Sequence, residues 1–280
     1  MMNLAFTDIS PKVGISISES PDLRSLGLNE GHLRDAMAII ALQLLSSGIS
    51  LAYGGDLRQH GFSRLLAELI GRYKGHPRHT GTIAITDYLA WPVHISMTSD
   101  QLAAFAASYE RVAELVYLAL DGARLSQEKR SELSSHEPHD GEWTQGLTAM
   151  RTVMLKDIRA RLVLGGRVEG HKGAMPGIAE ETYLSLEAHQ PVFILGGFGG
   201  CARDIAETLG LADRWAGSRE EWSGQKYFQK FSSDDLHNGL SQEENLVLAH
   251  TPHIQQAINF VARGLDQIIQ ESQNNAQSFY

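Results

Sequence analysis

Glycine-rich turns at three places in the chain could bind an anionic group. They span residues 53–61, 165–170 and 196–200, each between a strand pattern and a helix pattern. Glycine lets backbone N–H groups approach a phosphate closely, and the following helix directs its positive dipole end toward it. One such turn could equally be a tight connection that binds nothing. Three together favour a crevice for a phosphate-bearing ligand, with contacts from Gly54, Gly55, Gly165, Gly166, Gly196, Gly197, Phe198 and Gly199.

Charged side chains beside these turns could complete such a site. Asp56 follows the first glycine pair and could bind a ribose hydroxyl, while Arg58 could bind a phosphate. Arg167, His171 and Lys172 lie in the second turn and its continuation, where three basic groups suit a pyrophosphate. The alternatives are an aspartate that only caps its turn and basic residues on an ordinary solvated loop.

The first half of the chain alternates between strand and helix patterns. Apolar periodicity predicts, in order, a strand at 12–18, a helix at 32–47, a strand at 49–53, a helix at 62–73 and a strand at 82–85. This order is typical of a parallel sheet with right-handed crossovers. Ser16 and Ser18 end the first strand, so their hydroxyls would face the crevice and bind phosphate, or else cap the next element.

The second half of the chain continues the alternation. It is predicted to contain a helix at 100–120, an exposed loop at 127–144, a helix at 147–159, a strand at 161–164, a helix at 177–189, a strand at 191–195 and a helix at 201–209. We therefore predict an α/β fold, a Rossmann-like, doubly wound parallel sheet with helices on both faces. Residues 1–211 would form its nucleotide-binding core, and residues 212–280 a mainly helical extension packed on it.

Composition narrows the classes of function. The 280-residue chain has a net charge of −9, which disfavours nucleic-acid binding. No apolar run approaches the roughly 20 residues that span a bilayer, and the first residues lack a signal pattern, so we expect a cytoplasmic protein. Its single cysteine, Cys201, suits a reducing compartment. His136, Glu137 and His139 lack a metal-site spacing, so we expect neither a metal nor another cofactor.

The order of the motifs resembles the SLOG superfamily, whose LOG-type members are phosphoribohydrolases. The resemblance rests on Tyr53-Gly54-Gly55 at a strand end, Met150-Arg151 on a helix, and the glycine pair Gly165-Gly166. The helix start Gly177-Ile178-Ala179-Glu180-Glu181 corresponds to the last part of the family's PGGxGTxxE signature. The resemblance implies a Rossmann-like fold in which Arg151 and Glu181 lie beside the ribose-phosphate. It also implies that Gly177 lies at the helix start that binds the ligand.

Departures from that signature point to one part of the superfamily. The segment from Arg167 to Pro176 separates the glycine pair from the helix start, and Ile178 stands where the signature has threonine. Such departures resemble the ligand-binding branches associated with bacterial immunity and nucleotide-derived signals. The resemblance implies a sensor of an ADP-ribose-like ligand or a mononucleotide, acting as a homo-oligomer or with a separate effector protein. The alternatives are a LOG-type hydrolase that releases free base, with Arg151 and Glu181 as catalytic residues, and a partner-binding protein with a vestigial pocket.

Overall fold

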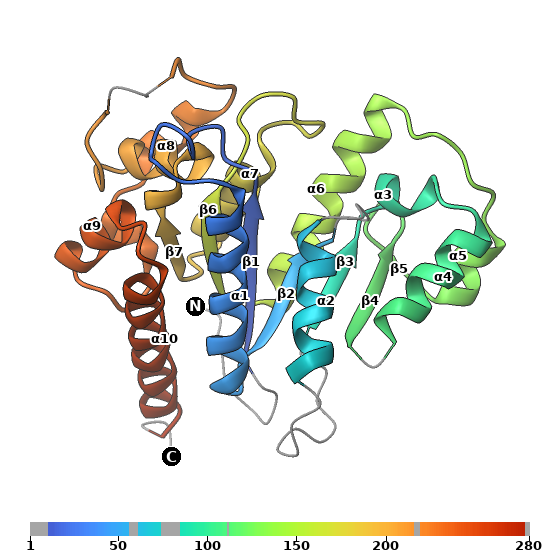
Figure 1. Cartoon of the computed structure of the whole chain (residues 1–280), viewed down its shortest axis with the longest axis horizontal. Coiled ribbons are helices and arrows are strands. Elements are labelled where there is room, and N and C mark those ends of the chain that lie inside the picture. Colours follow the sequence, from blue (N-terminus) through green and yellow to red (C-terminus); the bar gives the residue numbers. More distant parts are fainter. Residues whose placement is uncertain (1–10, 56–60, 74–84, 111, 216–218, 278–280) are drawn as a thin grey trace.

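A seven-stranded sheet forms the centre of the protein (Figure 1). The computed structural model describes residues 11–55, 61–73, 85–110, 112–215 and 219–277. The strands are β1 (Lys12–Ser18), β2 (Ser50–Gly54), β3 (Ile85–Leu89), β4 (Ala113–Leu118), β5 (Arg124–Leu125), β6 (Ala160–Gly165) and β7 (Val192–Leu195). Their order across the sheet is β5-β4-β3-β2-β1-β6-β7, and only the β4–β5 pair is antiparallel. The predicted Rossmann-like α/β fold is confirmed.

The direction in which strands are added reverses beside β1. The chain first builds β2, β3 and β4 outward on one side of β1 and then returns to place β6 and β7 on the other side. Ser16 pairs in register with Val163, and Ser18 with Gly165, at the carboxyl ends of β1 and β6. Parallel sheets form a ligand crevice where the strand order reverses. The topology therefore predicts a ligand crevice at the carboxyl ends of β1 and β6.

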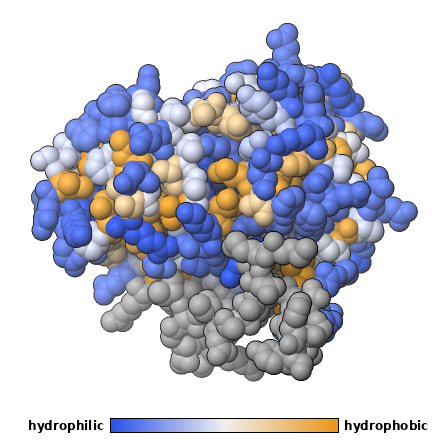
Figure 2. All heavy atoms as spheres, turned by 180° about the vertical axis from the view of Figure 1, so that it is seen from behind, coloured by the Kyte–Doolittle hydropathy of each residue, from blue (hydrophilic) through white to orange (hydrophobic). Residues whose placement is uncertain are grey.

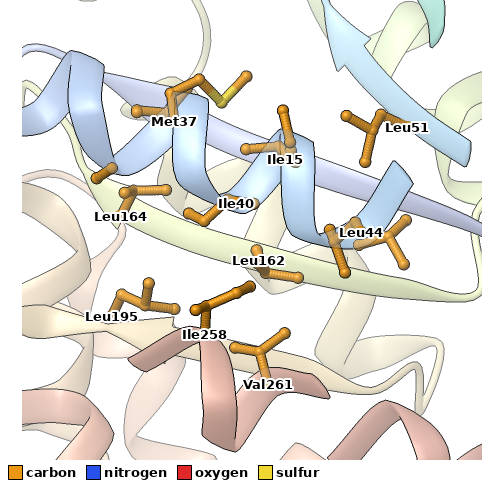
Figure 3. Close-up of a cluster of buried hydrophobic side chains, with 14 of the residues drawn as sticks. Ile15, Met37, Ile40, Leu44, Leu51, Leu162, Leu164, Leu195, Ile258 and Val261 are labelled. Carbon is orange, nitrogen blue, oxygen red and sulfur yellow. The ribbon is translucent and has the colours of Figure 1, made fainter. Parts of the chain in front are cut away.

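Helices cover both faces of the sheet. One face carries α1 (Glu30–Ser46), α2 (Phe62–Tyr73) and α10 (Ile254–Gln277), and the other carries α6 (Asp140–Asp157), α7 (Gly177–Glu187) and α8 (Gly200–Thr208). Apolar residues recur every three or four positions along α1, so this helix has one apolar side. Strand β7 is instead apolar on both sides: Phe193 and Leu195 lie in the core on one face of the sheet, and Val192 and Ile194 lie in the core on the other. Figure 3 shows the resulting core, in which Ile15 lies against α1 and Leu162 lies between α1 and α10.

The remaining helices lie near the two edges of the sheet. They are α3 (Trp91–Ile95), α4 (Ser99–Tyr109), α5 (Gln127–Glu132) and α9 (Gln242–His250), with short 3₁₀ segments at Gly196–Phe198, Gln225–Lys230 and Ser233–Leu236. Seen from behind, hydrophobic groups are visible between hydrophilic ones (Figure 2), so the surface is mixed despite the net charge of −9. Among the described residues, no helix is long and apolar enough to cross a membrane.

Two sequence-based predictions of local structure were wrong. The helix predicted for 100–120 ends at Tyr109, and its second part is strand β4, because apolar residues continue through 115–118 and masked the change of element. The predicted loop at 127–144 contains α5 and the first turn of α6. His139 and Glu142 form a reciprocal cap there, with Glu142 N donating to His139 Nδ1 over 3.3 Å. The strand predicted at 82–85 is described only from Ile85, where β3 begins; residues 82–84 lie outside the described residues.

A buried histidine fixes α3 against the sheet. His94 Nε2 lies 2.9 Å from the carbonyl oxygen of Leu118, and Arg130 Nε donates to His94 Nδ1 over 2.7 Å. Burial lowers the pKa of His94 to about 4, with Arg130 adding to the effect, so the ring is neutral at pH 7. The neutral ring can donate through one nitrogen and accept through the other, as both contacts require. This contact holds Pro92 and Val93 of α3 in place.

Candidate functional site

A cavity of about 540 Å³ opens at the carboxyl ends of β1 and β2. Its volume lies within the range of about 300–1,000 Å³ that is usual for small-molecule sites. The predicted ligand-binding residues that line it are Ser16, Ser18, Gly54, Gly55, Arg151, Arg167, Lys172, Gly177 and Glu181. These residues come from segments far apart in the sequence, and the strand reversal beside β1 brings them together.

The N-terminus of α7 opens into this cavity. Pro176 precedes the helix and has no side-chain oxygen that could cap it, while Gly177 and Ile178 line the cavity. A Cβ atom on Gly177 would lie 2.8 Å from Arg151 Nη2, so glycine lets the guanidinium approach the helix start. The positive end of the helix dipole and the Arg151 cation therefore lie at one point, an arrangement that attracts an anion.

A fully buried arginine lies behind the lining residues Ser16 and Glu181. Arg161 of β6 has no exposed surface; its Nη1 donates to Ser16 Oγ over 2.8 Å and to Glu181 Oε2 over 2.9 Å. Its Nε donates to Ser185 Oγ over 2.8 Å. Burial lowers the pKa of Arg161, and the Glu181 carboxylate acts in the opposite direction. The sequence analysis missed Arg161, although a charged residue within the apolar run of β6 was a signal for it.

Arg151 extends this network along α7. It forms an ion pair through Nη1 with Glu180 Oε2, and its Nε lies 3.6 Å from Glu181 Oε1. Thr148 donates to the other oxygen of Glu180, and Ser16 donates to Glu181 Oε2. Two guanidinium groups thus face two carboxylates in a region that is over nine-tenths buried. Such a network is rigid, because breaking any pair would leave a buried charge uncompensated.

One wall of the cavity is apolar. It is formed by Pro92, Val93, Pro138, Trp143 and Leu147. Glu142 stabilises this wall, because it accepts hydrogen bonds from Trp91 Nε1 over 2.8 Å and from His139 N over 3.2 Å. The hydrogen bond from Trp91, followed by that from His136, lowers the pKa of Glu142 to about 2.

The segment after Gly166 covers part of the cavity. Residues 167 and 169–173 of this segment line it, and the segment has no helix or strand. Arg167 Nε lies 3.4 Å from Glu19 Oε2 in an exposed ion pair. Further along the segment, Lys172 contacts α6: its Nζ lies 3.9 Å from the centre of the Trp143 ring, and its carbonyl oxygen accepts from Thr144 Oγ1 over 3.4 Å.

The glycine pair of the second turn and the whole third turn do not line the cavity. Gly165 and Gly166 close the end of β6, where a Cβ atom on Gly166 would lie 2.9 Å from the Cβ of Cys201. Gly196, Gly197, Phe198 and Gly199 are packed in the interior, and a Cβ atom on Gly197 would lie 2.1 Å from the Thr251 carbonyl oxygen. Asp56 and Arg58 lie outside the described residues.

The N-terminus of α8, after the third glycine turn, is occupied by a carboxylate of the protein itself. Gly200 N donates to Asp22 Oδ2 over 2.6 Å, and Arg219 forms an ion pair with the same oxygen. Arg219 Nε also lies 3.2 Å from Asp204 Oδ2. Burial raises the pKa of Asp204 to about 6, and Arg219 opposes the shift. Burial also raises the pKa of the Cys201 thiol, so this cysteine is an inert packed residue.

Comparisons with known proteins identify the family of the chain. Among the described residues, no group of three or more histidine, cysteine, aspartate or glutamate side chains is placed to hold a metal ion. No curated protein matches the chain. The family described as SLOG cluster2 matches residues 9–249, a stretch that includes every strand of the sheet and every residue of the cavity. The chain therefore belongs to the SLOG cluster2 family, within the SLOG superfamily.

Proposed function

We propose that the protein binds a nucleotide or a nucleotide-derived signal, ADP-ribose-like or a mononucleotide, as a sensor in bacterial signalling or defence. The observation that carries the proposal is the uncapped N-terminus of α7, which opens together with Arg151 into the cavity. A phosphate group there would accept hydrogen bonds from backbone N–H groups and from the guanidinium. Arg167 and Lys172 add positive charge at the rim.

The ribose would lie between the phosphate and the opposite wall. Glu181 and Ser18 line the adjoining part of the cavity, where a carboxylate and a hydroxyl suit ribose hydroxyl groups. Gly54 borders the same part of the cavity: a Cβ atom there would lie 3.1 Å from Met150 Cε and 3.5 Å from Glu181 Oε1. Charge and shape thus match a ligand with one anionic end.

A LOG-type phosphoribohydrolase is the second candidate. It is favoured because Arg151 and Glu181 lie close together in one cavity, with Arg151 Nε 3.6 Å from Glu181 Oε1. However, Glu181 Oε2 already accepts hydrogen bonds from Ser16 and Arg161. A carboxylate that assists departure of a base must have an oxygen within reach of the reacting group. Because Glu181 is held by the protein through one oxygen and flanked by Arg151 at the other, binding without hydrolysis is the better-supported function.

The proposal extends to the partners of the protein and to its location in the cell. We propose that residues 212–280 act as a helical extension of the 1–211 core and that the protein works as a homo-oligomer or with a separate effector in the cytoplasm. Ligand binding could then be transmitted through a protein–protein surface. Light scattering of the purified chain with and without nucleotide tests this part, since a monomer in both conditions contradicts the homo-oligomer.

Calorimetric titration and a base-release assay together test the proposal. The wild type should bind AMP or ADP-ribose and release little or no free base from AMP. Glu181→Ala should weaken binding by about 1–3 kcal/mol, because a hydrogen bond to a charged group is lost. Glu243→Ala, which removes an exposed glutamate from the first turn of α9, is the matched control and should change nothing. Rapid base release by the wild type that disappears in Glu181→Ala, with binding intact, would instead establish the hydrolase.

A further inference from the structure

The face of one tryptophan in the cavity is covered by a lysine. Trp143 lies in the first turns of α6 and is half-buried, and Lys172 Nζ lies 3.9 Å from its ring centre. Both residues line the cavity, so the covered indole face belongs to the cavity wall. A planar ring that entered the cavity could stack on this face only if Lys172 moved away.

The contact between Lys172 and Trp143 is weak enough for a ligand to replace it. Lys172 is exposed, and among the described residues no carboxylate lies within ion-pair distance of its ammonium group. A cation–π contact at an exposed site is weak. The segment that carries Lys172 has no regular secondary structure, and Gly170 and Gly173 flank the residue. Moving the lysine therefore breaks few interactions.

Two parts of the cavity suit the two ends of a nucleotide. Trp143, Pro92, Val93 and Leu147 form the apolar wall, which suits a planar ring, while the N-terminus of α7 with Arg151 suits an anionic group. A ligand that has a ring at one end and a phosphate at the other would fit both parts. Its phosphate would attract the ammonium group of Lys172.

We propose that Trp143 is the stacking platform for the ligand's planar base and that Lys172 moves from the indole face to the ligand's phosphate on binding. This inference rests on the proposed nucleotide-binding function and adds the residues that select a base-bearing ligand over a bare sugar phosphate. Trp143 determines specificity, and Lys172 covers the hydrophobic face while the cavity is empty.

Calorimetric titration of the full chain with three probes tests the proposal. AMP and ADP-ribose carry a base, whereas ribose 5-phosphate has the phosphate and sugar without one. Trp143→Leu should weaken binding of the base-bearing probes by about ten-fold to a hundred-fold, the usual loss for a removed stacking contact. It should leave the affinity for ribose 5-phosphate within about two-fold, and Trp143→Phe should restore most of the loss.

The lysine is tested separately. Lys172→Met should weaken all phosphate-bearing probes to a similar degree. Lys226→Met is the matched control, because Lys226 lies 5.8 Å from the ring centre of Tyr227 outside the cavity. Melting temperatures of the unliganded variants, expected within a few degrees of the wild type, verify that the substitutions spare the fold.

The outcomes distinguish failure of the stacking inference from failure of the proposed function. Unchanged AMP and ADP-ribose affinity in Trp143→Leu, or an equal loss for ribose 5-phosphate, would overturn this inference and leave the proposed function in place. Failure of the wild type to bind any of the three probes would overturn the proposed function and this inference with it.

Discussion

The helices α7 and α8 both begin after glycine-rich segments, yet their N-termini have different surroundings. The N-terminus of α7 follows Pro176 and opens into the cavity, whereas that of α8 is capped by Asp22, whose Oδ2 accepts from Gly200 N over 2.6 Å. Arg219 then neutralises Asp22. Both helices have the same dipole, so the dipole alone does not define a ligand site. What distinguishes them is whether a carboxylate of the protein accepts from the backbone N–H groups at the helix start.

The largest effect is expected from a substitution in the buried charge network beside the N-terminus of α7. Arg161→Met should reduce the free energy of unfolding by about 3–5 kcal/mol, because Glu181 loses the guanidinium group that donates to its buried Oε2. Arg167→Met, at the exposed ion pair with Glu19, should cost less than about 0.5 kcal/mol. Urea unfolding measures both. Equal, small losses would show that the fold behind the cavity does not depend on this buried charge.

The third glycine turn should depend on packing. A Cβ atom on Gly197 would lie 2.1 Å from the Thr251 carbonyl oxygen, so Gly197→Ala should cost about 1–3 kcal/mol of unfolding free energy. The control, Gly71→Ala on α2, introduces a methyl group with no heavy atom within 4 Å and should be neutral or slightly stabilising. If Gly197→Ala folds as stably as the wild type but no longer binds nucleotide, this turn is part of a ligand site after all.

A smaller effect is expected where the protein supplies its own anion. Asp22→Ala should cost about 0.5–2 kcal/mol, the usual value for a lost helix cap. Added sulfate should then stabilise this variant more than it stabilises the wild type, because the anion can occupy the vacated place beside Gly200 and Arg219. Asp35→Ala, at an exposed position of α1, is the control. The comparison between the two helices fails if sulfate acts equally on Asp22→Ala, Asp35→Ala and the wild type.

Local periodicity was sufficient to predict most of the fold. The stripe of apolar residues predicted a helix at 32–47, and α1 spans Glu30–Ser46, because residues on one side of a helix must meet the sheet whatever the rest of the chain does. The same reasoning failed at 100–120, where an apolar pattern runs without a break from α4 into β4.

The candidate site was only partly accessible from the sequence. Its motif residues Arg151, Gly177 and Glu181 do line one cavity. The glycines at 196–199 resemble those at 54–55 in sequence, and nothing local reveals that one group packs against Thr251 while the other borders the cavity. Likewise, the anion that fills the N-terminus of α8 comes from Asp22, which is 178 residues away in the chain. Such long-range partners depend on the packing of the whole sheet.

Ligand-linked unfolding tests the central claim most directly, that a nucleotide binds at the open N-terminus of α7. A nucleotide at about 100 times its dissociation constant should raise the free energy of unfolding by about 2.7 kcal/mol. The same rise in Asp22→Ala would show that the α8 end plays no part in binding. If no member of a panel of mononucleotides and ADP-ribose-like compounds stabilises the wild type, or if the stabilisation disappears in Asp22→Ala, the account is contradicted.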